Sequence, residues 1–126
     1  MEMKNWKGKT ILLVEDDEIS LEFLKELFEP YKVRIVEVFN GKEAVEACKN
    51  DSDIDLVLMD VQLPVLNGRE AMREIKKIRP DLPVIAQTAF AMSGDRERYL
   101  RDGFSDYISK PINVPGLIQV INTYFS

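Results

Sequence analysis

Acidic side chains stand directly after two short apolar runs of this 126-residue sequence. Glu15 and Asp16 follow the run Thr10–Val14, and Asp60 follows the run 56–59. Carboxylates that meet at one place repel one another, by about 4 kcal/mol for a pair at roughly 4 Å where the effective dielectric constant is near 20. Such a cluster persists when a cation neutralises it, and oxygen ligands without sulfur or imidazole suit Mg²⁺. We therefore expect a magnesium site if these carboxylates converge.

Two more runs end in groups that suit phosphate oxygens: Thr88 closes the run Val84–Thr88, and Lys110 follows the run 107–109. Taken singly, each of these residues has an ordinary structural explanation. The acidic stretch 15–18 is typical of a solvated loop, a lone aspartate of a helix cap, and a lysine before a proline of no particular function. A functional role is favoured because all of these residues stand at corresponding ends of predicted strands. Ordinary surface residues would not need to share that position.

The order of elements predicts how these ends are positioned. Apolar or alternating runs predict strands at 10–14, 33–39, 56–59, 84–88 and 107–109. Helical patterns follow each strand: one that Pro30 ends, one capped by Asn40 with Glu43 at the capping-box spacing, one from Asn67 to Ile78, one from Ser93 to about Asp102, and one over Val114–Phe125. Strands alternating with helices predict a doubly wound parallel sheet, in which ligands bind off the carboxyl ends of the strands.

Composition narrows the class of protein. The chain has 17 basic and 22 acidic residues, a formal charge of −5, no histidine and one cysteine. This charge argues against binding nucleic acid, and no apolar run approaches the roughly 18–20 residues of a membrane span. Cys48 cannot form an internal disulfide, and the N-terminal residues lack the apolar core of a signal peptide. We expect one small cytoplasmic domain. Because it has no histidine, we expect no histidine-based catalysis, no metal site with histidine ligands and no phosphohistidine of its own.

Four segments together resemble the response-regulator receiver domain of two-component signalling. They are residues 11–17 (ILLVEDD), residues 58–64 (LMDVQLP) with Gly68, Thr88-Ala89 and Lys110-Pro111. The resemblance implies a flavodoxin-like α/β fold, a doubly wound five-stranded parallel sheet of order 2-1-3-4-5 with five helices. We expect an N-terminal extension at 1–8, which contains Trp6, and a receiver domain at 9–126.

The resemblance implies that Asp60 is the phosphoacceptor and that Glu15 and Asp16 are the acidic pair beside it. Asp16, Asp60 and the backbone carbonyl of Gln62 would bind Mg²⁺ directly, and Glu15 would bind it through water. Mn²⁺ is expected as a substitute ion. Asp17 and Glu18 would then begin the first helix, where acidic side chains complement the helix dipole.

The same resemblance gives roles to residues of the later strands. Thr88 and Lys110 would hold the phosphoryl oxygens, and Tyr107 would be the switch aromatic, with plain packing as its alternative. The Lys110-Pro111 peptide bond is expected to be cis. Gln62 and Phe90, each two residues after a site residue, would flank the approach of the water that removes the phosphoryl group.

Partners follow from what the chain lacks. Because no residue here can donate the phosphoryl group, we expect an external histidine kinase or histidine phosphotransfer domain. A downstream partner would bind the face formed by the fourth helix, fifth strand and last helix. We expect no direct nucleic-acid or membrane contact, a monomer or weak phosphorylation-dependent dimer, and no catalysis beyond phosphorylation and dephosphorylation of the domain itself.

Two other classes of protein use a similar fold. A phosphatase of the haloacid-dehalogenase type also has an aspartyl nucleophile and Mg²⁺, but it needs an aspartate as general acid where Gln62 stands. A flavodoxin-like electron carrier needs a phosphate-cradling loop where the acids 15–18 stand. The lead Gly8-Lys9-Thr10 resembles receivers at the ends of hybrid sensor kinases, so we expect such a parent protein, with a stand-alone regulator as the alternative.

Overall fold

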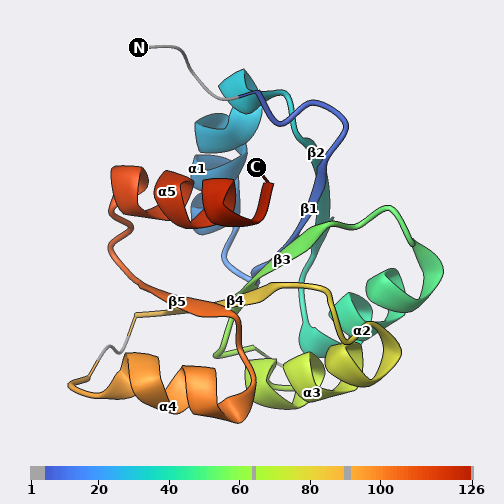
Figure 1. Cartoon of the computed structure of the whole chain (residues 1–126), viewed down its shortest axis with the longest axis vertical. Coiled ribbons are helices and arrows are strands. Elements are labelled where there is room, and N and C mark those ends of the chain that lie inside the picture. Colours follow the sequence, from blue (N-terminus) through green and yellow to red (C-terminus); the bar gives the residue numbers. More distant parts are fainter. Residues whose placement is uncertain (1–4, 64, 90–91, 126) are drawn as a thin grey trace.

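The computed structural model describes residues 5–63, 65–89 and 92–125, and Figure 1 traces them from the N-terminus in blue to the C-terminus in red. Five parallel strands form one sheet in the order β2-β1-β3-β4-β5. This order confirms the fold expected from the sequence. The strands are β1 (Thr10–Val14), β2 (Arg34–Val38), β3 (Leu56–Asp60), β4 (Val84–Thr88) and β5 (Asp106–Ser109).

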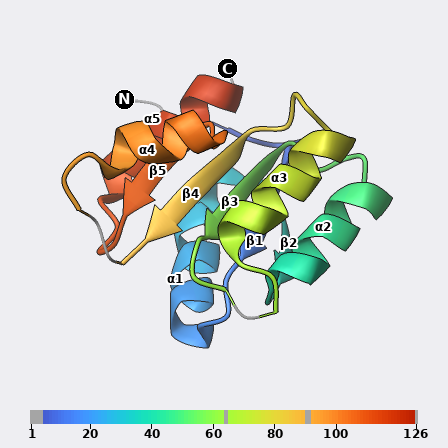
Figure 2. The ribbon, with the colours of Figure 1, turned by 90° about the horizontal axis from the view of Figure 1, so that it is seen from below.

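Helices cover both faces of the sheet. In Figure 1, α1 and α5 lie above it and the other three α-helices below it, and Figure 2 views these three from below. In the described parts of the chain, no helix is long and apolar enough to cross a bilayer. The helices are α1 (Glu18–Phe28), the short 3-10 helix η1 (Glu29–Tyr31), α2 (Gly41–Asn50), α3 (Gly68–Ile78), α4 (Asp95–Asp102) and α5 (Val114–Phe125).

Side chains that alternate along the central strands build a separate core on each face. On β1, Leu12 and Val14 pack with α2 and α3, whereas Ile11 and Leu13 pack with α1 and α5. Every residue of β1, β3 and β4 is buried, while the edge strands β2 and β5 are only partly covered. The continuous apolar runs of the sequence therefore mark strands buried on both faces.

Side-chain caps fix where three helices begin. Asp17 caps α1, and Asn40 and Asn67 cap α2 and α3 through bonds from the amides of Glu43 and Glu70 to their side-chain oxygens. These contacts confirm both predicted asparagine caps. The helices therefore start immediately after the loops that leave the carboxyl ends of the strands.

One predicted helix boundary differs from the observed one, and another is confirmed. Ser93 does not cap α4: the cap residue is Gly94, at φ 83°, and the helix begins at Asp95. The Asp95 carboxylate, in the first turn of the helix, accepts a hydrogen bond from the Met92 amide and so holds the backbone that precedes the helix. Pro30 ends the first α-helix as predicted: α1 stops at Phe28, and Pro30 lies in the first turn of η1, a position that tolerates proline.

Trp6 precedes the first strand yet is part of the core on the α1–α5 face, with 2% of its surface exposed. Its ring stacks on Tyr31 at 4.2 Å between centroids and also contacts Phe28 and Phe125. Its indole N–H donates to Asn122 Oδ1 at 2.7 Å. The segment expected to be an extension thus contains a residue that ties α1 to α5.

We expect Trp6→Ala to lower the free energy of unfolding by about 3–5 kcal/mol, because it removes a large buried side chain and leaves a cavity. Trp6→Phe keeps an aromatic ring but loses the bond to Asn122, so it should cost clearly less. Urea unfolding followed by circular dichroism measures both losses. Tryptophan fluorescence cannot be used, because Trp6 is the single tryptophan and both variants lack it. Equal, small losses in the two variants would contradict the structural role.

Candidate functional site

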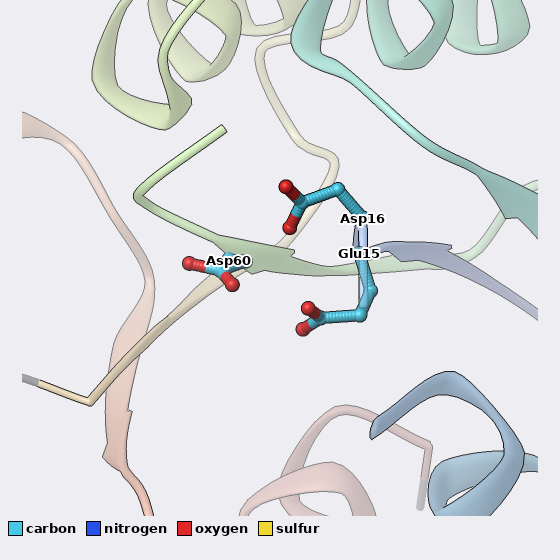
Figure 3. Close-up of side chains that lie close together, drawn as sticks. All are labelled: Glu15, Asp16 and Asp60. Atoms are coloured by element: carbon cyan, nitrogen blue, oxygen red, sulfur yellow. The ribbon is translucent and has the colours of Figure 1, made fainter. Parts of the chain in front are cut away.

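The carboxyl ends of β1 and β3 bring three carboxylates together. Glu15 and Asp16 follow β1, and Asp60 is the last residue of β3. One carboxylate oxygen from each residue lies within 4.8 Å of the others. Figure 3 shows the three side chains directed toward one another. Glu15 is buried, Asp60 is nearly so, and Asp16 is exposed, so the cluster opens to solvent on the Asp16 side.

Strand register decides which face of the sheet each site residue occupies. Asp60 pairs with Gln87 on β4, and Gln87 pairs with Ile108 on β5. Side chains two residues apart share a face, so Lys110 continues the row of Ile108. The Lys110 amide donates to the Thr88 carbonyl at 2.8 Å, which extends the pairing one residue beyond β5. Asp60, Lys110 and Glu15, which is two residues after Leu13, therefore lie on the α1–α5 side.

Lys110 enters the cluster as its counter-charge. Its ammonium Nζ lies 3.1 Å from Glu15 Oε2 and 3.4 Å from Asp60 Oδ2. One ammonium opposes three carboxylates, so the site keeps an excess of negative charge. The peptide bond between Lys110 and Pro111 is cis.

The shifted pKa values reflect this excess. Burial raises the pKa of Glu15, the charge of Asp60 raises it further, and Lys110 only partly opposes them. Burial alone would lower the pKa of Lys110, but the carboxylates of Asp60 and Glu15 outweigh it and raise that pKa. Lys110 therefore stays charged, and the cluster favours any further cation.

The loop after β3 is held against the cluster by backbone contacts. The Gln62 amide donates to Asp60 Oδ1 at 2.9 Å, and the Gly68 amide donates to the Val61 carbonyl at 3.2 Å. A Cβ atom on Gly68 would lie 2.6 Å from the Val61 Cα, so this approach requires glycine. The loop thereby fixes one oxygen of Asp60 and leaves the Oδ2 oxygen to Lys110.

Thr88 and Tyr107 belong to the opposite side of the sheet. Thr88 is the buried last residue of β4, next to Gln87 and therefore on the other face. Tyr107 pairs with Ala86 and packs into the α2–α3–α4 core. Its ring stacks on Tyr99 of α4 at 5.3 Å, and burial raises the pKa of its hydroxyl. Phe90 lies outside the described residues.

The structure adds two residues that the sequence did not single out. Gln87 is buried beside Glu15, and Tyr99 contacts the proposed switch aromatic. A polar residue inside the fully buried run Val84–Thr88 was the available signal for Gln87. No comparable signal marked Tyr99, because a half-buried tyrosine on a helix is ordinary.

The donor set fits a hard divalent ion. Glu15, Asp16 and Asp60 supply only oxygen ligands, which suit Mg²⁺. A nucleophilic carboxylate, an ammonium and a hydroxyl at neighbouring strand ends are the groups that phosphoryl transfer to an aspartate requires. Gln62 has no acidic proton, so the general acid of a haloacid-dehalogenase-type phosphatase is missing at that position.

Sequence comparisons identify a family and relatives of this chain. The family model of the response regulator receiver domain matches residues 11–122. The polar-differentiation response regulator DivK of Brucella anthropi is 40% identical over 119 residues, which cover 92% of this chain and 95% of that protein.

Solved structures agree with these sequence relatives. The receiver domain of the sensor histidine kinase PA1611 from Pseudomonas aeruginosa, which has a magnesium ion coordinated in its active-site cleft, superposes with a TM-score of 0.84 and 35% identity over 94% of this chain and 98% of its own. The receiver domain of Ssk1 from Saccharomyces cerevisiae, in complex with the histidine phosphotransfer protein Ypd1, gives a TM-score of 0.84 and 30% identity over 97% and 92%. With the acidic cluster at the strand ends of the same fold, the chain belongs to the response regulator receiver domain family, the phosphoacceptor domains of two-component systems.

Proposed function

We propose that Asp60 accepts a phosphoryl group from a phosphohistidine of a partner protein. Asp16, Asp60 and the Gln62 carbonyl would bind Mg²⁺ directly, and Glu15 would bind it through water. The observation that carries this proposal is the position of Lys110, whose ammonium lies 3.4 Å from Asp60 Oδ2 inside an acidic cluster. A cation fixed there can neutralise a phosphoryl oxygen as soon as one arrives on Asp60. Mn²⁺ would serve as a substitute ion.

The reaction breaks the P–N bond of the donor and forms a P–O bond to Asp60. Charge on the transferring group spreads over its oxygens, so fixed cations and donors provide most of the rate. Lys110 would hold one of these oxygens, and the Thr88 hydroxyl would hold another from the neighbouring strand end. When bound, Mg²⁺ supplies further neutralisation of that charge.

The phosphoryl donor is external, because the chain has no histidine. The complex of the Ssk1 receiver with Ypd1 supports a histidine phosphotransfer protein or histidine kinase in this role. The helix α1 begins two residues after Asp16 and carries exposed apolar side chains in its first turns: Ile19 is 81% and Phe23 45% exposed. They stand four residues apart on one face of the helix. We assign the docking of the donor to this face.

The downstream partner would bind the face formed by α4, β5 and α5. Phosphorylation would draw the Thr88 hydroxyl toward the phosphoryl group, and Tyr107 would follow it inward, a shift between two populated states. Gln62 is exposed beside Asp60 and would orient the hydrolytic water. Phe90, two residues after Thr88 in sequence, would hinder that water and prolong the phosphorylated state.

The parent protein can be of two kinds. The PA1611 receiver is part of a sensor histidine kinase, and DivK is a response regulator. We favour the receiver of a hybrid sensor kinase because of the lead Gly8-Lys9-Thr10, with a stand-alone regulator as the alternative. In either case we propose a monomer or a weak dimer that forms on phosphorylation.

Asp60→Asn should abolish phosphorylation, because the amide cannot act as the nucleophile. The wild-type chain, incubated with acetyl phosphate and Mg²⁺, should gain one phosphoryl group by intact-mass measurement. Asp17→Asn is the matched control, since it removes a nearby charge that does not belong to the cluster. Unchanged labelling of the Asp60 variant would refute the assignment.

Asp16→Asn should weaken Mg²⁺ binding roughly tenfold or more, since it deletes a ligand. Without metal, the same change relieves repulsion among the carboxylates, so the melting temperature should stay equal or rise. Calorimetric titration and thermal melts measure the two effects. Asp17→Asn again serves as control because asparagine caps a helix about as well as aspartate. A clear loss of metal-free stability in Asp16→Asn alone would contradict mutual repulsion.

Phe23→Ala should slow phosphoryl transfer from a phosphorylated histidine phosphotransfer domain about tenfold, as for the loss of one aromatic anchor at an interface. Its phosphorylation by acetyl phosphate should remain unchanged, because this small donor needs no docking. Ile78→Ala, at the far end of α3 and with similar exposure, is the control. Equal slowing with both donors would show damage to the site rather than to docking.

A further inference from the structure

Gln87 is a polar residue in one of the most buried strands of the sheet. It lies on β4 between Asp60 of β3 and Ile108 of β5, with 1% of its surface exposed. The other residues of β4 are the apolar Val84, Ile85 and Ala86 and the terminal Thr88. A core-filling role would be served by an apolar side chain, so the amide calls for another explanation.

The Gln87 side chain contacts the acidic cluster through Glu15. Its amide Nε2 lies 3.4 Å from Glu15 Oε2, the same oxygen that accepts from Lys110 Nζ at 3.1 Å. The other oxygen of Glu15 accepts from the Asp17 amide at 3.2 Å. The Gln87 amide must direct its NH₂ group at Glu15, because in the flipped orientation its carbonyl oxygen would face a carboxylate oxygen and the two acceptors would repel.

Stability does not account for this amide. Gln87 Oε1 is buried and has no hydrogen-bond partner among the residues that the structure describes. A buried acceptor without a donor keeps its desolvation cost uncompensated, whereas an apolar side chain of the same size would carry no such cost. Polar groups retained at such a cost are typical of functional sites.

We propose that Gln87 is a positioning residue that, by donating to Glu15, keeps Lys110 available to the phosphoryl group on Asp60. Gln87 does not touch the reacting atoms but acts through Glu15. This inference rests on the proposed function, because it assigns Lys110 to a phosphoryl oxygen.

The shared oxygen of Glu15 explains the effect. The Lys110 ammonium contacts both Glu15 Oε2 and Asp60 Oδ2, at 3.1 and 3.4 Å. The Gln87 amide satisfies part of the demand of Glu15 Oε2 for donors. Without it, this buried oxygen depends on Lys110 alone, and the ammonium is drawn toward Glu15 and away from Asp60.

Gln87→Met removes the amide and keeps the length of the side chain. At saturating Mg²⁺, we expect both the affinity for the phosphoryl mimic beryllofluoride and the rate of phosphorylation by acetyl phosphate to fall about three- to tenfold, the effect of one hydrogen bond. Mg²⁺ affinity, measured by calorimetry without the mimic, should stay equal or rise, because Glu15 loses a donor and keeps its full charge. The melting temperature should not fall.

Two further variants separate positioning from packing. Ile85→Met alters the same face of β4 two residues earlier, away from the cluster, and should leave beryllofluoride affinity unchanged. In a Glu15→Gln background, Gln87→Met should have no further effect on beryllofluoride affinity, because the Glu15 carboxylate through which Gln87 acts is absent. Gln87→Leu repeats the test with a second apolar side chain if the methionine variant does not fold.

A lower beryllofluoride affinity with intact Mg²⁺ affinity, lost in the Glu15→Gln background, supports the proposal. The proposal would be overturned if the affinities for beryllofluoride and Mg²⁺ fell in parallel, if neither affinity changed, or if the effects of Gln87→Met and Glu15→Gln on beryllofluoride affinity were fully additive. If the wild-type chain itself neither bound beryllofluoride nor became phosphorylated on Asp60, the proposed function would fail instead, so the two failures are distinguishable.

Discussion

The ion pair of Lys110 with Glu15 and Asp60 is the interaction on which the proposed chemistry of this domain depends. Three carboxylates within 4.8 Å of one another repel, and two of them are largely withdrawn from water, which strengthens the repulsion. A single ammonium compensates only part of that charge: burial and the charge of Asp60 raise the pKa of Glu15 by more than Lys110 lowers it. The site is therefore left in need of a cation. A cluster fully neutralised by protein side chains would bind Mg²⁺ weakly, and one without Lys110 would repel a phosphoryl group, so partial compensation suits both ligands.

The fold can hold such a cluster because its central strands are fixed from both faces. β1, β3 and β4 are fully buried, and the two cores anchor their ends against the repulsion between the side chains they carry. Alternation along the strands also separates two tasks. Asp60, Gln87 and Lys110 lie on the α1–α5 side, where the donor would dock, whereas Thr88 and Tyr107 belong to the α2–α3–α4 side. Adjacent residues of β4 thus connect the charge cluster to the opposite face.

Local signals of the sequence predicted the strands, the parallel sheet and the convergence of Glu15, Asp60 and Lys110, because two-face burial and strand ends follow from short apolar runs. Contacts between distant segments could not be read in this way. Trp6 joins the core through α1 and α5, and the contact of Gln87 with Glu15 depends on register across β1, β3 and β4. The start of α4 was misjudged for a different reason: its cap residue is Gly94 in a left-handed conformation, and a glycine has no side chain that could signal a cap.

The same packing indicates where a signal can leave the site at low energetic cost. α3 contributes Ala71, Met72 and Ile75 to the core, whereas the one buried residue of α4 is Asp95, which pairs with Arg98. Tyr99 attaches α4 to the sheet mainly through its stack on Tyr107 and its edge contact with Phe104. Segments with few buried apolar contacts move at small cost in free energy. Tyr107 belongs to this attachment and lies on the same face of the sheet as Thr88, beside Ala86. In the proposed switch, a displacement of Thr88 would therefore reach the contact that holds α4. Aromatic stacking, with little aliphatic packing to reinforce it, would then set the balance between the two proposed states of the α4–β5–α5 face.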